Sequence, residues 1–208
     1  MWIVKLGGSW VSNPELLKLI DKLYNYRNEP IVLVVGGGKF VDAIRFAHDK
    51  INFDEGLAHK LSVKSTEIYA KILKNIASKK ISFVKRFSEI NSKKKLEIFL
   101  PDKELIKDKL LEKNWESTSD SIACWLARKI KGKGVIFIKS VSFENQIASS
   151  LDYLQKKGIL DKNINYHLNT NIRLKVVGPE ILCKIEKFKT WNKIINSFTK
   201  IEWKKKIK

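Results

Sequence analysis

Five consecutive apolar residues, Ile31 to Val35, run directly into three glycines, Gly36 to Gly38. Four of the five are β-branched, which is typical of a strand buried on both faces of a parallel sheet. After the glycines, apolar residues recur at helical spacing: Phe40, Val41, Ile44, Ala47 and Ile51. A strand, a glycine loop and a helix start bring backbone amides and the helix dipole to one point. Such a point can bind an anion.

The N-terminus has a similar arrangement. Trp2 to Val4 is a short apolar run, and Gly7, Gly8 and Ser9 follow it closely. Because glycine has no side chain, the backbone N–H groups of this loop can approach a phosphate. Lys5 can place a compact positive charge over the same spot. Taken alone, the stretch is equally well explained as a tight turn that leaves a strand. Two such loops, each ending a buried strand, favour phosphate binding.

The rest of the chain continues the alternation of helices and strands. The patterns predict helices over residues 14–27, 55–78, 103–112 and 179–188, another from about residue 117, and a short one near Leu151. They predict strands over residues 81–84, 96–100, 135–138 and 172–177, and residues 191–203 are ambiguous. The long helix over residues 55–78 carries one apolar face, formed by Leu57, Leu61, Ile68, Ile72 and Ile76. Alternation of this kind predicts a three-layer α/β/α sandwich around a central, mainly parallel sheet. We expect one domain over residues 1–208, with a basic tail at about 201–208.

The charge of the chain is strongly positive, with 41 Lys and Arg against 22 Asp and Glu and a net charge of +19. This excess indicates a nucleic-acid partner, a strongly anionic ligand, or simply a lysine-rich bias on solvated faces. The lysines are spread along the whole chain, and no nucleic-acid-binding signature is present, so we expect no specific nucleic-acid partner. Apolar runs fall far short of the ~18 residues that a membrane span needs. The two cysteines are far apart in the sequence, and we expect both to be free thiols in a reducing cytoplasm. The start of the chain shows no signal peptide, which agrees with a cytoplasmic location. The three histidines are scattered, so we expect no metal cluster.

The stretch around Asp120 has two interpretations. Ser117-x-x-Asp120 stands at the start of a predicted helix and forms a serviceable capping box, with an acidic side chain that complements the helix dipole. A catalytic interpretation of Asp120 comes only from a resemblance to a known family. The first interpretation makes it structural and the second makes it catalytic.

Three motifs together resemble the amino acid kinase superfamily. They are Lys5-x-Gly-Gly-Ser9, the Gly36-Gly-Gly38 loop that leads a helix, and Thr118-Ser-Asp120-x-x-Ala123. They occur in that family's order and cover roughly residues 1–140. Within the superfamily, the sequence is most similar to the short kinases of methanofuran biosynthesis. This similarity lies in Asp54–His59, Trp115–Ala123 and Val135–Ser140.

The resemblance implies an ATP- and Mg²⁺-dependent kinase with the amino acid kinase fold. Its acceptor would be a small phosphate compound, (5-(aminomethyl)furan-3-yl)methyl phosphate, which it would convert to the diphosphate. One segment departs from the pattern, because the nucleotide-base segment that larger relatives carry after Ile138 is not recognisable here. The nucleotide preference therefore stays open. We also expect a homo-oligomer.

The candidate site residues follow from these motifs and from the needs of phosphoryl transfer, which are in-line placement and charge neutralisation. Lys5 would lie over the transferring group, and Asp120 would either hold Lys5 or help to place Mg²⁺. The donor phosphates would contact Gly7, Gly8, Ser9 and Ser140, and the acceptor would contact Gly36, Gly37, Gly38, Thr118 and Ser119. Lys139 is either a second catalytic cation or an ordinary lysine at a strand end. His59 either touches the acceptor or lies on the helix surface.

Three functions remain open from the sequence. The first is the phosphate kinase, and the alternative within the same superfamily is a uridylate, isopentenyl phosphate or amino-acid kinase. The second is an anion-binding or storage protein on the same fold, which has less need of both Lys5 and Asp120. The third is a nucleic-acid binder, which would need its basic residues on one face.

Overall fold

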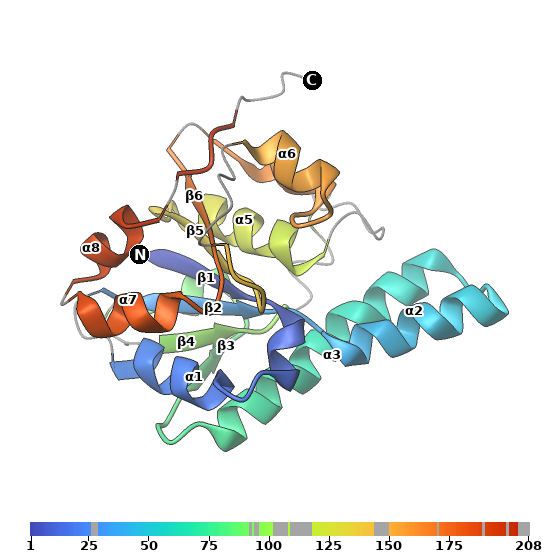
Figure 1. Ribbon diagram of the computed structural model, residues 1–208. Helices are drawn as coiled ribbons and strands as arrows, with labels where there is room; N and C mark the ends of the chain where they lie inside the picture. Colours follow the sequence, from blue (N-terminus) through green and yellow to red (C-terminus); the bar gives the residue numbers. More distant parts are fainter. Residues whose placement is uncertain are drawn as a thin grey trace.

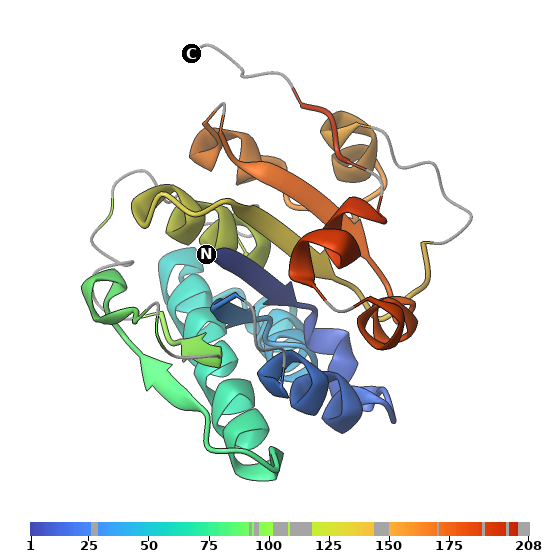
Figure 2. The same cartoon turned by 90° about the vertical axis from the view of Figure 1, so that its left-hand side faces the viewer.

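The computed structural model describes residues 1–25, 29–91, 93, 96–101, 108, 118–143, 150–169, 171–188, 190–198 and 200–203. Its centre is a six-stranded sheet in which every paired strand is parallel, in the order β3-β4-β2-β1-β5-β6. The strands are β1 (Trp2–Leu6), β2 (Ile31–Val35), β3 (Ser82–Val84), β4 (Leu96–Phe99), β5 (Gly134–Ile138) and β6 (Arg173–Val177). Figure 2 shows β6 in orange at one edge and β3 in green at the other. The predicted α/β fold with a parallel sheet is confirmed.

Helices cover both faces of this sheet. One core contains residues of α1 (Leu16–Asn25), α3 (Glu55–Ile76), α7 (Ile181–Lys187) and α8 (Trp191–Asn196), packed with one side of the strands. The other core contains residues of α5 (Ser119–Lys129) and α6 (Leu151–Lys156). In the view of Figure 1, α5 and α6 lie above the sheet and α1 lies below it. Burial of apolar surface on both faces is the main force that holds the three layers together.

The first strand shows how the sheet divides its side chains. Trp2, Val4 and Leu6 belong to the core on the α1 side, whereas Ile3 belongs to the core on the α5 side. Since successive side chains of a strand point to opposite faces, Lys5 lies on the same face as Ile3. The lysine is therefore directed towards α5, the helix that carries Asp120.

Helix α2 (Lys39–Ile51) pairs with the first half of α3 and projects from the body of the protein, as the two cyan helices of Figure 1 show. The long helix is confirmed, but the apolar face that its periodicity indicates is not buried. Leu57, Leu61, Ile68, Ile72 and Ile76 are 37–48% exposed. Instead, α3 is fixed to the sheet by Tyr69, Ala70 and Leu73, which belong to the core.

Several predicted details differ or lie outside the described residues. The first helix begins at Leu16 rather than at Pro14, because the side chain of Asn13 accepts the amide of Glu15 in a turn before the helix. Apart from Asp108, which is not in a helix, the predicted helix over residues 103–112 lies outside the described part, as do Ser117 of the capping box and tail residues 204–208. Three short 3₁₀ segments, η1 (Gly8–Ser12), η2 (Phe87–Glu89) and η3 (Lys162–His167), complete the chain. None of the described helices is long and apolar enough to cross a membrane.

Candidate active site

The register of the sheet brings three predicted motifs to one edge. Leu6, Val35 and Ile138 lie in one row across β2, β1 and β5. The next residues along these three strands are Gly7, Gly36 and Lys139. Both glycine loops and Lys139 therefore leave the sheet side by side at the carboxyl ends of parallel strands, where open α/β sheets bind their ligands.

The two glycine loops pack directly against each other. A Cβ atom added to Gly8 would lie 2.1 Å from the nitrogen of Gly38, and one added to Gly36 would lie 2.8 Å from the nitrogen of Gly8. Gly38 also has a φ of +53°, which residues with a side chain rarely adopt. Because no side chain fits between these loops, their backbone groups stay close together. Helix α2 begins directly after Gly38, so the positive end of its dipole lies at the contact between the two loops.

Asp120 binds two lysines on the α5 side of the sheet. Its Oδ1 lies 2.8 Å from Nζ of Lys5, and its Oδ2 lies 3.0 Å from Nζ of Lys139. The side chains of Lys5 and Asp120 are almost completely buried, and that of Lys139 is largely buried. Both oxygens of Asp120 are thus occupied by ion pairs, in the first turn of α5. Two ammonium groups face one carboxylate here, so the cluster carries one surplus positive charge when all three groups are ionised.

The environment changes the pKa values of this cluster. Burial alone would raise the pKa of Asp120, but the ammonium groups of Lys139 and Lys5 hold it below its usual value. For Lys139, burial and the neighbouring charge of Lys5 lower the pKa, although Asp120 opposes the shift. Asp120 is therefore ionised at neutral pH, and Lys139 loses its charge more easily than a lysine in water does.

Two further pairs join the site. The hydroxyls of Ser9 and Ser140 lie 2.7 Å apart, so the first glycine loop is linked to the residue after Lys139. Thr118, the N-cap residue of α5, donates its hydroxyl and its amide to the carboxylate of Asp161. The segment after β5 thus contributes to the site as well.

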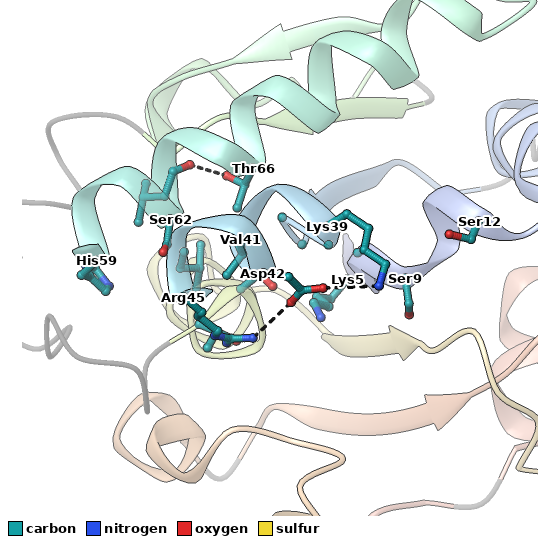
Figure 3. Close-up of a pocket in the computed structure, with 18 residues that line it drawn as sticks. Lys5, Ser9, Ser12, Lys39, Val41, Asp42, Arg45, His59, Ser62 and Thr66 are labelled. Atoms are coloured by element: carbon teal, nitrogen blue, oxygen red, sulfur yellow. Dashed lines mark hydrogen bonds and ion pairs between the residues drawn. The ribbon is translucent and has the colours of Figure 1, made fainter. Parts of the chain in front are cut away.

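A cavity of about 470 Å³ opens beside these loops. It is lined by Lys5, Gly8, Ser9, Gly36, Gly37, Gly38, Thr118 and Ser119, together with residues of η1, α2, α3 and α5. Figure 3 shows His59, Ser62 and Thr66 from α3 on one side and Asp42 and Arg45 from α2 near the middle. His59 is buried and lines the cavity, so the interpretation as an exposed surface histidine is wrong.

The cavity walls differ in charge and in hydrogen bonding. Lys5, Lys39 and Arg45 line it as cations, and Asp42 lies 3.7 Å from Arg45 and 3.9 Å from Lys39. On the α3 wall, the hydroxyls of Ser62 and Thr66 donate to helix carbonyls. Those two hydroxyl protons are used within the helix, so the oxygens offer lone pairs. The α3 wall therefore suits a hydrogen-bond donor, and the glycine-loop wall suits an anion.

The structure places all the predicted site residues at this edge of the sheet and adds others. Those that the sequence analysis did not single out are Lys39, Asp42, Arg45, Ser62, Thr66 and Asp161. The first three stand at intervals of three residues directly after the glycines, on one face of a predicted helix, which is a signal that could have found them. Asp161 comes from a segment without periodicity, so no local signal marks it.

Comparisons with known proteins agree with this geometry. Residues 1–142 match the amino acid kinase family. The chain is 33% identical over 146 residues to [5-(aminomethyl)furan-3-yl]methyl phosphate kinase of Methanocaldococcus jannaschii. That match covers 68% of this chain and 66% of the relative, so the chain spans somewhat less than two thirds of the relative's length.

Solved structures show the same fold. Uridylate kinase from Archaeoglobus fulgidus superimposes with a TM-score of 0.62 at 16% identity, over 89% of this chain and 95% of that protein. UMP kinase from Ureaplasma parvum gives a TM-score of 0.61 at 15% identity, over 97% and 98% of the two chains. At these identities the likeness concerns the fold alone.

Proposed function

Because the chain belongs to the amino acid kinase family, we propose that it is an ATP-dependent kinase that phosphorylates a small phosphomonoester to a diphosphate. The acceptor we propose is [5-(aminomethyl)furan-3-yl]methyl phosphate, which the printed name of the 33% identical relative gives as its substrate. The observation that carries the proposal is the Lys5–Asp120–Lys139 cluster at a cavity faced by two glycine loops. The presence of both Lys5 and Asp120 in this cluster favours catalysis over storage of an anion.

The charges of the cluster suit phosphoryl transfer. A phosphoryl group carries negative charge on its outer oxygens while it moves, and positive charge fixed nearby stabilises it without reorganisation. Lys5 lines the cavity and supplies this charge directly, while Asp120 holds its ammonium in place. Lys139 anchors the second oxygen of Asp120 and contributes the surplus positive charge of the cluster.

The two glycine loops divide the substrates between them. Gly7, Gly8 and Ser9, with Ser140, would hold the donor phosphates, and Gly36–Gly38 at the start of α2 would hold the acceptor phosphate. The loops touch at Gly8 and Gly38, so the two phosphates would meet where the loops meet. Closeness of this kind is what an in-line transfer requires.

The far wall of the cavity supports an acceptor that carries an amine. The lone pairs of Ser62 and Thr66 and the carboxylate of Asp42 would accept N–H groups, while the phosphate of the same molecule faces the glycines. The cavity volume of about 470 Å³ is within the ~300–1,000 Å³ range of small-molecule sites. A small molecule with a phosphate at one end and an ammonium at the other fits both walls.

Magnesium would enter with the nucleotide. Among the described residues, no cluster of three or more His, Cys, Asp or Glu side chains could hold a metal. Both oxygens of Asp120 are occupied by lysines, so we propose that Asp120 holds lysines rather than the metal. Mg²⁺ in kinases is commonly bound largely by substrate phosphates, where it neutralises charge on the transferring group.

We test this function with an ADP-release assay. The protein is incubated with ATP, Mg²⁺ and either phosphomonoesters or amino acids, with and without hydroxylamine. Phosphomonoesters should give ADP without hydroxamate, because a diphosphate does not react with hydroxylamine as an acyl phosphate does. Hydroxamate from aspartate or glutamate would move the protein to the carboxylate-phosphorylating branch. Tight anion binding without turnover would indicate a storage protein.

We also propose that the enzyme is a homo-oligomer joined through the exposed apolar face of α3. A 22-residue helix with five apolar side chains 37–48% exposed along one face is a common sign of an interface. A helix face can pair with its own copy about a two-fold axis. The double change Ile68→Lys and Ile72→Lys should therefore lower the mass measured by light scattering to that of a monomer. A wild-type monomer at ~50 μM would contradict this.

The proposed location is the cytoplasm. Cys124 and Cys183 are both free, and free thiols persist in a reducing compartment. Localisation of a fluorescent fusion would test this.

A further inference from the structure

Asp161 joins the C-terminal part of the chain to the helix that carries Asp120. The Oδ2 of Asp161 accepts the amides of Thr118 at 2.8 Å and Ser121 at 3.1 Å. Its carboxylate also accepts the hydroxyl of Thr118 at 2.7 Å and that of Ser121 at 3.0 Å. Asp161 lies outside residues 1–142, the part that matches the family. The contacts therefore link the matched part of the chain to a segment beyond it.

These hydrogen bonds complete the start of α5. The first amides of a helix lack partners within the helix, and an N-cap side chain normally accepts one of them. Thr118 occupies the N-cap position, but its side chain makes no capping bond and donates to Asp161 instead. Asp161 supplies the cap from a distant segment. The residues that it holds, Thr118 and Ser121, lie on either side of Ser119 and Asp120.

Asp161 is itself held from α6. The side-chain amide of Gln155 donates to the carbonyl of Asp161 at 2.7 Å and to that of Lys162 at 2.9 Å. Asn165 in turn donates to Gln155 at 3.4 Å. This network fixes the backbone at Asp161 and thereby the position of its carboxylate relative to α5.

The position of Asp161 is electrostatically unfavourable. Burial and the nearby negative charge of Asp120 raise the pKa of Asp161, and the hydrogen bonds from Thr118 only partly oppose this shift. A serine or asparagine would cap a helix without a second buried charge. A carboxylate accepts four hydrogen bonds from one helix turn, and neither of those side chains can do so. A carboxylate at this position points to a need for a rigid first turn.

We infer that Asp161 is a positioning residue for the proposed phosphoryl transfer. It fixes the first turn of α5 so that Asp120 stays between Lys5 and Lys139, and so that Thr118 and Ser119 keep their place in the cavity wall. The inference rests on the proposed function, since positioning is measured through turnover. A displacement of ~1 Å at a reacting centre can cost ~10²-fold in rate, so the effect of Asp161 should be large.

The test is the variant Asp161→Asn, which keeps the shape of the side chain and removes two of its hydrogen-bond acceptor sites. We expect kcat to fall at least ~10-fold while KM for ATP stays within ~2-fold, because the glycine loops are untouched. The matched control is Asp21→Asn. Asp21 joins α1 to Ser78 through a hydroxyl bond outside the cavity, and this variant should keep wild-type kcat. All assays are run at least ~10 °C below the melting temperature of each variant.

A double-mutant cycle separates positioning from a general loss of structure. If Asp161 acts through Asp120, Asp161→Asn should lower kcat less than ~2-fold in an Asp120→Asn background. A kcat within ~2-fold of wild type in the single variant, or equal losses in both backgrounds, would overturn the inference. If Asp161→Asn does not fold, Ser121→Ala removes only one of the four bonds and should lower kcat ~3-fold. An unchanged kcat there would overturn the inference equally.

Wild-type turnover keeps the two proposals apart. A wild-type protein without turnover would end the proposed function, and a crystal structure of Asp161→Asn would then decide the inference. We expect Asp120 to leave contact with at least one lysine in that variant. Unchanged distances from Asp120 to Lys5 and Lys139 would refute the positioning role.

Discussion

Lys5 of the first strand lies 2.8 Å from Asp120 of α5, and both side chains are almost completely buried. A buried lysine and a buried aspartate are costly to desolvate, and their attraction repays this only with good geometry and further partners. Here Lys139 provides the further partner on the second oxygen of Asp120. Lys5 lies in β1 and Lys139 directly follows β5, the strand paired with β1, so the sheet itself sets the width of the cluster.

Removing the Lys5 side chain should abolish most turnover while the fold remains. In Lys5→Ala, Asp120 keeps Lys139, so a balanced buried pair remains and the melting temperature should fall only modestly. The loss of a charge aimed at the transferring group should lower kcat ~10²–10³-fold. Steady-state kinetics and a thermal melt measure both effects, and near-normal turnover would end the assignment of Lys5.

Neutralising Asp120 should affect both stability and rate. Asp120→Asn leaves the ammonium groups of Lys5 and Lys139 buried without a counter-charge, so the free energy of unfolding should fall by about 3–5 kcal/mol. A helix-capping role alone would cost ~1 kcal/mol and leave kcat unchanged. Denaturant unfolding and kinetics on the same variant separate the two roles. Normal turnover with a loss of ~1 kcal/mol would favour the cap.

The lowered pKa of Lys139 predicts a fall in activity at alkaline pH. Because burial depresses this pKa in the folded state, the ammonium is lost below the ordinary lysine value of ~10.4. Between the pKa of Lys139 in the folded protein and its higher pKa in the unfolded chain, the unfolded chain binds more protons than the folded protein does. The contribution of Lys139 to the free energy of unfolding therefore rises with pH in this range. A kcat–pH profile should therefore decline before pH ~10.4. Lys139→Arg, which stays protonated, should lack this decline, and an identical profile would contradict the role.

The contact between the glycine loops can be tested by one methyl group. Gly8→Ala would place its Cβ 2.1 Å from the nitrogen of Gly38, so the two loops must separate. The donor and acceptor phosphates that we propose they bind would then lie too far apart for transfer. We expect kcat/KM to fall at least ~10²-fold. Gly132→Ala is the matched control, because its Cβ would meet no atom closer than 3.4 Å. Equal activity of the two variants would show that the loop contact does not matter.

The sequence predicts the parts of this site that depend on local patterns. The strand–glycine–helix stretch at Ile31–Gly38 and the strand before Gly7 each contain their own signal, and parallel pairing then brings the loops together. The partnership of Lys5 with Asp120 was one of two roles that the family motifs implied for Asp120, the other being placement of Mg²⁺. The contact of Lys139 with the same carboxylate depends on the register of β1 and β5, and the sequence did not predict it. From the sequence, Lys139 was either a second catalytic cation or an ordinary lysine at a strand end.

The remaining features depend on long-range packing. The capping of α5 by Asp161 joins residues 40 and 43 positions apart, and no local periodicity encodes such a contact. The apolar face of α3 shows the opposite case. Its helical spacing was clear, but spacing does not tell whether the sheet or a second molecule covers the face. Tyr69 and Leu73, on another side of the helix, bind it to the sheet.

A ³¹P NMR spectrum of the reaction mixture tests most directly whether the protein transfers a phosphoryl group from ATP to the phosphomonoester. Enzyme, ATP, Mg²⁺ and [5-(aminomethyl)furan-3-yl]methyl phosphate are combined, and Lys5→Ala serves as the parallel sample. We expect the phosphomonoester singlet to be replaced by two coupled doublets of a diphosphate as ADP forms, and we expect Lys5→Ala to leave the singlet in place. An unchanged singlet beside intact ATP in the wild-type sample would contradict this expectation.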